Sequence, residues 1–238
     1  MGGAAGKIPR GGRSSARLRS PPQIPSSTEG VRILKDLFSI EGKTALVTGG
    51  SSGIGAMIAL GYVEAGAKVY IASRKQEVCE AVAAELSEVG TCIALPADLR
   101  DEAQCNRLAD EVAEREGKLE ILVNNAGANW GEPMETFPDA AWDRVLGLNV
   151  KAIFSLTRRL VPTLEAAGSP EDPARVINIG SIDGIKPPAL ETYAYSASKA
   201  AVHHMSRVLA AKLAPVSYTH LRAHETEADL VCRLLLEK

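Results

Sequence analysis

The sequence predicts an α/β fold with a doubly wound parallel sheet of the Rossmann-like type, truncated at its C-terminal end before the sixth strand. Short apolar stretches alternate with helical patterns along the chain, and a glycine-rich turn follows the first of those stretches. The chain has 238 residues, of which 45% are hydrophobic, so it can bury a sizeable core. Strands that alternate with helices are typical of βαβ units, whose parallel sheet is covered on both faces.

The first half of the chain supplies three strands and two helices. The apolar run from Thr44 to Val47 leads into the glycine turn, and a helical pattern then continues to about Ala65, where Gly66 ends it. The next elements are strands over residues 68–72 and 92–95, separated by a helix rich in Ala and Glu over residues 76–89.

The second half repeats the alternation. Asp101 is placed to cap a helix that runs to about Glu116, because a carboxylate at that position accepts hydrogen bonds from the first free N–H groups. We expect strands over residues 121–123 and 175–179, and helices over residues 139–167 and 192–213.

Composition excludes several classes of function. The formal net charge is -2 and no apolar run is long enough to span a bilayer, so we expect neither a nucleic-acid nor a membrane partner. Four cysteines are scattered without a C-x-x-C pair, which favours free thiols in a reducing compartment. His220 and His224 are spaced to share one metal, but they lie in a doubtful C-terminal segment, and we predict no metal site.

The N-terminal end differs in composition from the rest. Residues 1–28 contain five basic residues, several Ser, Gly and Pro, and no acidic residue. Such a segment buries too little apolar surface to order itself, and the same composition describes an organelle transit peptide. We therefore interpret residues 1–30 as a disordered or a targeting extension. The expected location is the cytoplasm, or a mitochondrion or plastid if the extension is a transit peptide.

The glycine turn reads Thr48-Gly49-Gly50-Ser51-Ser52-Gly53-Ile54-Gly55. A strand, a glycine turn and a helix in this order form the dinucleotide-binding arrangement, in which the helix N-terminus faces a pyrophosphate. A Cβ at Gly49, Gly53 or Gly55 would obstruct that approach. The glycine pattern alone is a weak signal, since it also describes an ordinary turn, and the βαβ context gives it weight.

Tyr195 and Lys199 are four residues apart in the predicted final helix. Four residues turn through about 400°, so both side chains leave from one face. An ammonium at that distance favours the phenolate, and such a tyrosine can give a proton to a carbonyl oxygen or take one from an alcohol. The pair alone is more often a plain helix surface. Tyr193 lies about 240° around the helix from Lys199 and is not expected to take part.

Position in the sheet strengthens this interpretation. Ligands of doubly wound sheets bind at the carboxyl ends of the strands. Gly49, Asn124, Ser181 and the start of the Tyr195 helix all fall at that edge of the predicted sheet. Their convergence points to one site that combines a coenzyme turn with a proton donor.

Together these motifs resemble the classical short-chain dehydrogenase/reductase family. Thr48-Gly49-x-x-x-Gly53-Ile54-Gly55 is similar to the family's coenzyme turn, and Asn124-Asn125-Ala126-Gly127 is similar to its fourth-strand motif. The resemblance covers residues 38–215. Within the family, residues 126–131 and 175–181 most resemble the 3-oxoacyl-[acyl-carrier-protein] reductases named for rhamnolipid biosynthesis. The residues that match the family's catalytic tetrad are Asn149, Ser181, Tyr195 and Lys199.

The resemblance implies a role for each member of the tetrad. Tyr195 would be the general acid of carbonyl reduction, and Lys199 would favour its phenolate and bind the nicotinamide ribose. Ser181 would stabilise the developing oxyanion, and Asn149 would hold a water that links Lys199 to solvent. An asparagine tied to backbone in the core is the alternative for Asn149. The residues expected to bind the coenzyme are Gly49, Ser51, Ser52, Gly53, Ile54, Gly55, Arg74, Lys75, Asp98, Asn125, Ala126, Gly127, Tyr195 and Lys199.

The residues after the second strand favour NADP over NAD. Arg74 and Lys75 stand where an NAD-specific relative places an acid for the ribose hydroxyls, and a guanidinium can hold a 2′-phosphate instead. A solvated basic loop is the alternative. Many NADP-preferring relatives carry a basic residue in the glycine turn, where this chain has Ser52. Asp98 resembles the family's adenine-contacting acid, with a helix N-cap as the alternative.

The resemblance stops after Pro215. The family pattern continues with a sixth strand, a Pro-Gly turn, a helical loop over the substrate and a seventh strand. Residues 216–238 instead resemble translated sequencing-adapter read-through, so we interpret them as a non-family tail on an incomplete domain over residues 31–215. A genuine short isoform with a helical C-terminus is the alternative, since Leu230, Leu234 and Leu235 would allow one. We expect truncation to leave the fifth strand as an exposed edge.

These observations predict an NADP-dependent oxidoreductase that reduces a carbonyl to the alcohol, with a 3-oxoacyl thioester as the expected substrate. The expected partner is a small-molecule carbonyl substrate, and the full-length parent is expected to form a homo-oligomer. A coenzyme-binding scaffold without catalysis is the alternative, because a truncated chain is expected to turn over little or no substrate. A nucleotide-sugar epimerase is disfavoured, because little chain remains for a sugar domain.

Overall fold

The computed structural model describes residues 38–170, 172–213 and 219–224, the last of these by their backbone. The chain divides into two compact units, Met1–Ser39 and Ile40–Lys238. Every element described below belongs to the second unit. Residues 1–37 lie outside the described part, and so do the expected properties of the N-terminal extension.

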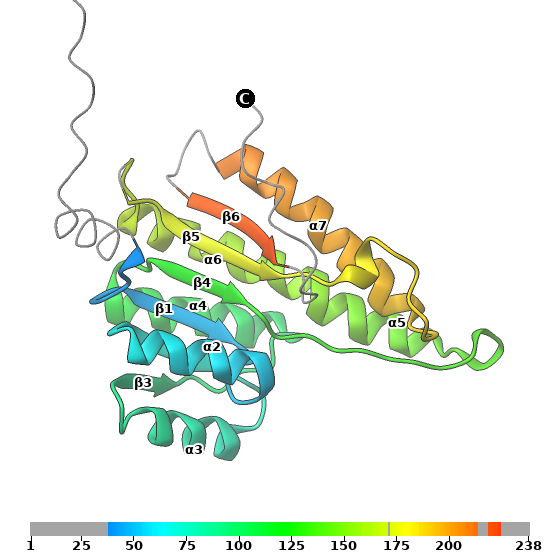
Figure 1. Ribbon diagram of the computed structural model, residues 1–238, viewed down its shortest axis with the longest axis horizontal. Coiled ribbons are helices and arrows are strands. Elements are labelled where there is room, and N and C mark those ends of the chain that lie inside the picture. The colour runs from blue at the N-terminus through cyan, green and yellow to red at the C-terminus, as the bar shows by residue number, and fades with distance from the viewer. Residues whose placement is uncertain (1–37, 171, 214–218, 225–238) are drawn as a thin grey trace, which may run out of the picture. The chain divides into compact units, whose positions relative to one another are not determined.

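A six-stranded, all-parallel sheet with the order β3-β2-β1-β4-β5-β6 organises this unit (Figure 1). The expected α/β class with a parallel, doubly wound sheet is confirmed. The strands are β1 (Thr44–Thr48), β2 (Lys68–Ala72), β3 (Thr91–Ala94), β4 (Ile121–Asn124), β5 (Ala174–Ile179) and β6 (Thr219–His224). The main helices are α2 (Gly53–Glu64), α3 (Gln76–Leu86), α4 (Glu102–Glu116), α5 (Asp139–Leu146), α6 (Ala152–Ala167) and α7 (Tyr193–Leu213).

Successive residues of a central strand face opposite sides of the sheet, and each side is covered by helices. Leu46 and Leu122 belong to one buried cluster, which includes side chains of α4 and α6. Val47 and Val123 belong to the other, which includes side chains of α2 and α3. Both faces of the sheet are therefore buried. This is why the central strands are continuous apolar runs in the sequence, as is typical of parallel sheets.

The predicted boundaries of α4 are confirmed by its caps. The Asp101 carboxylate accepts hydrogen bonds from the backbone N–H groups of Ala103 at 2.9 Å and Gln104 at 3.4 Å. At the other end Gly117 adopts a φ of 67°, a left-handed conformation that glycine reaches at little cost.

The expected single helix over residues 139–167 is interrupted. Residues Gly147–Lys151 form a π-helical turn between α5 and α6, and the N–H of Ala152 bonds to the carbonyl of Gly147 five residues earlier. Such single π-helical turns are frequent at functional sites. Here the turn carries Asn149, whose side chain is buried.

The expectation that the fold stops before a sixth strand is wrong. Strand β6 lies parallel to β5, with Ala174 opposite Thr219 and Ile179 opposite His224 (Figure 1). The physical reason is that β5 presents a row of free backbone N–H and C=O groups, and an extended segment satisfies them through its own backbone whatever its side chains are. Strand β5 is therefore an inner strand. Residues 216–218 and 225–238, including the expected C-terminal helix, lie outside the described residues.

Across the described ranges, no helix combines the length and the apolar character that crossing a membrane requires. The same part of the chain contains no group of three or more His, Cys, Asp or Glu residues that could hold a metal ion. Cys79, Cys92 and Cys105 are free and buried.

Candidate active site

The glycine turn lies between β1 and α2 and is built as a close backbone contact. Gly49 has a φ of 67°, and a Cβ there would lie 2.9 Å from the Nδ2 atom of Asn125 and 3.0 Å from the Cα of Ala126. A Cβ on Gly55 would overlap both the carbonyl oxygen of Gly49 and the Asn125 side chain. Two of the three signature glycines are thus required by the protein's own packing, which brings β1 against the end of β4.

Gly53 has a different reason for being glycine. Its φ is 52°, and a Cβ there would meet no atom within 4 Å. The left-handed backbone, rather than a protein contact, requires glycine at this position. The exposed N-terminus of α2 therefore keeps open space in front of it, as an anion-binding turn needs.

Asn125 and Thr48 hold the two strand ends together. The Thr48 hydroxyl oxygen accepts hydrogen bonds from the N–H groups of Asn125 and Ala126, both at 3.0 Å. The Asn125 side chain donates to the carbonyl of Thr48 at 3.0 Å. Asn125 is thus a structural brace of the turn, and its amide is occupied by backbone.

A cavity of about 320 Å³ lies beside the turn. Its size falls within the usual range for small-molecule sites. Seven of the residues expected to bind coenzyme line it: Gly49, Ser51, Ser52, Arg74, Lys75, Ala126 and Gly127. Lining residues that sequence reasoning missed are Ala72, Ser73, Val78, Ala97, Leu99 and Leu148.

Two features of the cavity fit a phosphorylated dinucleotide. Arg74 and Lys75 are exposed at its wall and supply positive charge. The Ser73 hydroxyl is buried in the same wall and has no hydrogen-bond partner among the described residues, so it is available to a ligand or a water. The residues present therefore fit an anionic nucleotide.

The remaining predicted coenzyme residues, Gly53, Ile54, Gly55, Asp98, Asn125, Tyr195 and Lys199, lie outside the lining of this cavity. Asp98 is held by Arg100, whose Nε and Nη2 donate to the two carboxylate oxygens at 3.1 and 2.6 Å. That hydrogen bond is the main reason why the pKa of Asp98 is lowered. The alternative for Asp98, a helix N-cap, is wrong, since Asp101 caps α4. Its expected contact with the adenine stays a prediction.

Tyr195 and Lys199 lie on one face of α7, as their spacing predicts. The Lys199 Nζ is 5.6 Å from the centre of the Tyr195 ring and donates to the carbonyl of Ile179 at 2.6 Å. Only 6% of Lys199 is exposed, and this burial lowers the pKa of its ammonium to about 8. Among the described residues no carboxylate pairs with this amine. A buried amine of this kind is expensive in a folded protein and is characteristic of functional sites.

Ser181 lies two residues after the end of β5 and is buried. Its hydroxyl oxygen accepts a hydrogen bond from the N–H of Asp183 at 3.2 Å, which leaves the hydroxyl proton free to donate. The 3₁₀ turn Ile182–Gly184 that follows packs on α7 through Gly184, where a Cβ would lie 2.6 Å from the backbone of Lys199 and Ala200. Sequence reasoning missed Gly184, although a glycine three residues after Ser181 was a readable signal.

Asn149 connects the π-turn to the loop after β4 and to α7. Its Oδ1 accepts from the Ala128 N–H at 2.7 Å, and its Nδ2 donates to the Ala128 carbonyl and to the Ser198 hydroxyl, both at 2.9 Å. Ser198 in turn donates to the carbonyl of Tyr195 at 2.6 Å. Both amide hydrogens of Asn149 are therefore occupied, as the alternative of a backbone-tied core asparagine describes.

These contacts join the cavity beside the glycine turn to α7. Gly127 lines the cavity, and a Cβ there would lie 3.4 Å from the Asn149 Oδ1. Asn149 bonds Ser198, and Ser198 bonds the backbone of Tyr195. Tyr193, by contrast, donates its hydroxyl to Glu191 at 2.8 Å and packs edge-on against Phe137, so it takes no part in this chain of contacts.

This combination of a parallel sheet, a glycine turn and a Tyr-Lys pair on the final helix defines a class of protein. Residues 43–223 match the family model described as short chain dehydrogenase, and the chain belongs to that family of dehydrogenases and reductases. It is therefore an oxidoreductase that interconverts CH–OH and C=O groups. The match extends past Pro215 into β6.

Among its relatives, a rhamnolipids biosynthesis 3-oxoacyl-[acyl-carrier-protein] reductase of Pseudomonas aeruginosa is 51% identical over 176 residues, which are 74% of this chain and 69% of that protein. An NADP-dependent (R)-specific alcohol dehydrogenase of Lentilactobacillus kefiri is 36% identical over 180 residues, 75% of this chain and 69% of that protein. The solved structure of a Pseudomonas aeruginosa RhlG/NADP active-site complex superposes with a TM-score of 0.76 at 48% identity, covering 79% of this chain and 73% of that one.

Proposed function

We propose that this protein is an NADP-dependent reductase of a carbonyl substrate, and that the substrate is a 3-oxoacyl thioester. The single observation that carries the proposal is the buried Lys199 ammonium over the ring of Tyr195, joined to the coenzyme cavity through Ser198 and Asn149. The substrate class rests on the relative that is 51% identical and is named a 3-oxoacyl-[acyl-carrier-protein] reductase.

The proposed reaction converts the substrate C=O into CH–OH. The nicotinamide coenzyme, when bound, supplies a hydride to the carbonyl carbon. The C=O π bond breaks, and the oxygen takes a proton from the Tyr195 hydroxyl, which leaves a phenolate. Ser181 donates a hydrogen bond to the same oxygen as its negative charge grows. The Lys199 ammonium then stabilises the phenolate until the proton is replaced.

Asn149 acts in this proposal mainly by position. Its side chain spans the Ala128 backbone and the Ser198 hydroxyl, so it fixes Tyr195 relative to the loop at the cavity. The expected water that resupplies protons to Lys199 stays a prediction. Because both Asn149 amide hydrogens are already hydrogen-bonded, such a water could bind this side chain only by donating a hydrogen bond to its Oδ1 atom.

The preference for NADP rests on charge. The cavity presents Arg74 and Lys75 and no carboxylate among its described lining residues. A guanidinium binds a phosphate through two parallel, charge-assisted hydrogen bonds, which a ribose hydroxyl cannot match. Several similar proteins carry NADP in their titles or names, which supports the same choice.

The proposal is tested by following coenzyme consumption with a 3-oxoacyl thioester. We expect the chain to oxidise NADPH in preference to NADH, and Tyr195→Phe to lower kcat by about 100-fold or more, because a general acid typically contributes that much. Tyr193→Phe is the matched control and should keep its activity, since within the described part of the chain the Tyr193 hydroxyl donates to Glu191 and contacts no member of the tetrad. Equal rates in the two variants would contradict the mechanism.

A coenzyme-binding scaffold is the second candidate, because the cavity and its basic wall of Arg74 and Lys75 would bind NADPH whether or not turnover follows. The same assay separates the two. Saturable NADPH binding without any turnover, in the wild-type chain and both tyrosine variants, would favour the scaffold. Homo-oligomerisation and a cytoplasmic location remain predictions, which light scattering and imaging of a tagged chain would check.

A further inference from the structure

A chain of buried polar side chains crosses the apolar core between the sheet and α7. The Asn124 side chain donates to the Asn178 Oδ1 at 2.8 Å, and the Asn178 Nδ2 donates to the Ser206 hydroxyl at 2.9 Å. Ser206 donates in turn to the carbonyl of Val202 at 2.8 Å. At its other end the chain reaches α6, where the Thr157 hydroxyl accepts from Asn124 at 3.2 Å. No step of the reaction proposed above uses these residues.

These polar side chains are almost completely buried. Asn178 is 0% and Ser206 is 5% exposed. Val176, on the same face of β5 as Asn178, belongs to the apolar cluster that includes side chains of α4 and α6. A polar group in such a place costs stability unless it is hydrogen-bonded, and hydrogen-bonded networks in a core rigidify the arrangement of the elements that they join. An apolar side chain would fill the same space without fixing that arrangement.

Ser206 lies on the same face of α7 as the Tyr-Lys pair. From Tyr195 to Ser206 the helix turns through about 1,100°, which is three turns and about 20°, so Tyr195, Lys199 and Ser206 leave from one face. Asn178 immediately precedes Ile179, whose carbonyl accepts a hydrogen bond from the Lys199 ammonium at 2.6 Å. Helix α7 is therefore attached to the end of β5 at two points, which lie about 10 Å apart along the helix axis.

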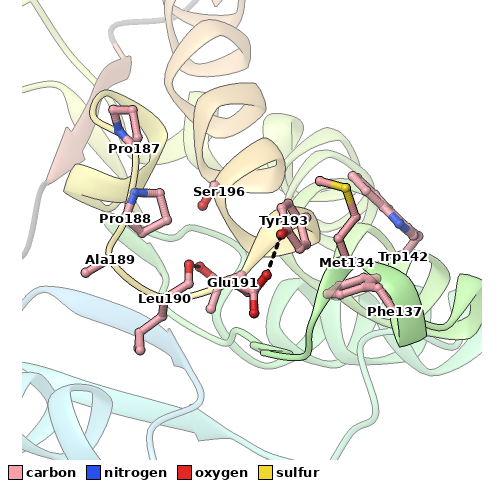
Figure 2. A pocket seen from close by; sticks show the side chains of 11 residues that line it. Met134, Phe137, Trp142, Pro187, Pro188, Ala189, Leu190, Glu191, Tyr193 and Ser196 are labelled. Atoms are coloured by element: carbon pink, nitrogen blue, oxygen red, sulfur yellow. Dashed lines mark hydrogen bonds between the residues drawn. The ribbon is translucent and has the colours of Figure 1, made fainter.

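A different side of the same helix borders open space. Figure 2 shows Tyr193 and Ser196, in the first turn of α7, among the residues that line a cavity of about 680 Å³. Such space leaves this end of the helix room to shift, and a misplacement of about 1 Å at the reacting groups can lower a rate about 100-fold. The attachment of α7 to β5 therefore bears directly on where Tyr195 and Lys199 lie.

We propose that Asn178 and Ser206 are positioning residues, which fix α7 on β5 and thereby align Tyr195 and Lys199 with the substrate carbonyl. The inference rests on the proposed function, because it gives these two residues a part in the reaction of Tyr195. Neither Asn178 nor Ser206 is among the residues that line the coenzyme cavity. Loss of their hydrogen bond should therefore slow the chemical step without weakening the binding of coenzyme.

The activity test compares two substitutions that each deprive a buried asparagine of one acceptor. Ser206→Ala removes the acceptor of Asn178 on α7, and Thr157→Val removes an acceptor of Asn124 on α6. Both should lower the melting temperature by a similar amount, about 2–10 °C. We expect kcat for a 3-oxoacyl thioester to fall about tenfold or more in Ser206→Ala alone, while the Kd for NADPH stays the same in both variants.

Ser206→Thr is the conservative variant. It keeps a hydroxyl that can accept from Asn178 and donate to the Val202 carbonyl, so it should restore most of the kcat that Ser206→Ala loses. If Ser206→Ala does not fold, Ser206→Cys takes its place in the comparison, because a thiol has a similar size and is only a weak acceptor. A wild-type kcat in the Ala or Cys variant, or equal losses of kcat in that variant and Thr157→Val, overturns the proposal.

Backbone hydrogen exchange gives a readout that needs no turnover. Mass spectrometry should show faster exchange over residues 195–205 in Ser206→Ala than in Thr157→Val, because only the first substitution releases α7 from β5. Equal exchange in the two variants overturns the attachment. If the wild-type chain turns over no 3-oxoacyl thioester, the proposed function fails, and this comparison alone decides whether Asn178 and Ser206 hold the helix.

Discussion

Lys199 illustrates how much of the site follows from single residues. Its pairing with Tyr195 is readable from the sequence, since a spacing of four places both on one helix face. The burial of Lys199 could not be predicted from the sequence, because the residues that surround it come from distant segments. One of these segments supplies the Ile179 carbonyl, which accepts a hydrogen bond from the ammonium. The hydroxyls of Ser73 and Ser198 were missed for the same reason: their surroundings exist only after folding.

The first prediction concerns the stability cost of Lys199. The pKa of its ammonium is lowered from 10.5 to about 8 by burial, so between these values the unfolded chain binds more protons than the folded one. The contribution of Lys199 to the free energy of unfolding therefore rises with pH through this window. Below pH 8 the ammonium is charged in both the folded and the unfolded chain, so its burial lowers the free energy of unfolding by the full amount. It amounts to about 3 kcal/mol as an upper bound.

Urea denaturation of the wild type and Lys199→Met checks this. The variant should be the more stable below pH 8, and the difference should shrink as the pH approaches 10. A difference that does not change across this range would contradict the assigned cause, because only the titration of Lys199 is absent from the variant.

The second prediction concerns Ser198 as a positioning residue. Ser198→Ala removes the hydrogen bond from Asn149 Nδ2 to the Ser198 hydroxyl and the one from that hydroxyl to the Tyr195 carbonyl. One buried Asn149 amide hydrogen is then left unpaired, which should lower the free energy of unfolding by about 1–3 kcal/mol. We also expect kcat to fall while NADPH affinity holds, since the cavity walls are untouched. Ser196→Ala is the control for stability, because that hydroxyl makes no hydrogen bond within the described residues. Equal effects in both variants would count against a positioning role.

At the scale of elements, the alternation of strands and helices was predictable because each carries a local signal. Apolar runs mark β1, β2 and β4, and a capping carboxylate and a glycine mark the two ends of α4. The π-turn over Gly147–Lys151 was not predictable. A π-turn differs from an α-helix in having backbone hydrogen bonds to the fifth rather than the fourth preceding residue. The hydrogen bond from the Ala128 N–H to the Asn149 side chain accompanies this turn, and it forms only once the chain has folded.

Strand β6 was missed for a related reason. Sequence reasoning judged residues 219–224 by their departure from a family pattern, whereas pairing depends on the backbone and on the free edge of β5. The third prediction follows. Proline at both Leu221 and Arg222, which pair with Val176 and Ile177, removes two successive N–H groups, one of which faces β5 whichever way the strand is turned.

We expect this double proline variant to be destabilised by about 3 kcal/mol, the usual order for a proline that breaks regular structure. The matched control is alanine at the same two positions, which keeps both N–H groups. Thermal unfolding of the two variants gives the comparison. Equal stability would mean that β6 does not contribute to the sheet.

At the scale of the whole molecule, the site exists because the parallel sheet brings the ends of β1, β4 and β5 to one edge. The glycine turn, the Asn125 brace, Ser181 and the N-terminal part of α7 come from distant parts of the sequence and meet there. The order of motifs along the chain was enough to predict this convergence, because strand ends of parallel sheets share an edge.

The central claim is that Tyr195 delivers a proton to a carbonyl oxygen while the coenzyme delivers hydride to the adjacent carbon. The most direct measurement is transfer of label from NADPH deuterated at the transferred position to a 3-oxoacyl thioester, read by mass spectrometry of the product. The account predicts one deuterium on the new carbinol carbon with the wild type and Tyr193→Phe, and almost none with Tyr195→Phe. Unlabelled product from the wild type, or labelled product at the wild-type rate from Tyr195→Phe, would contradict it.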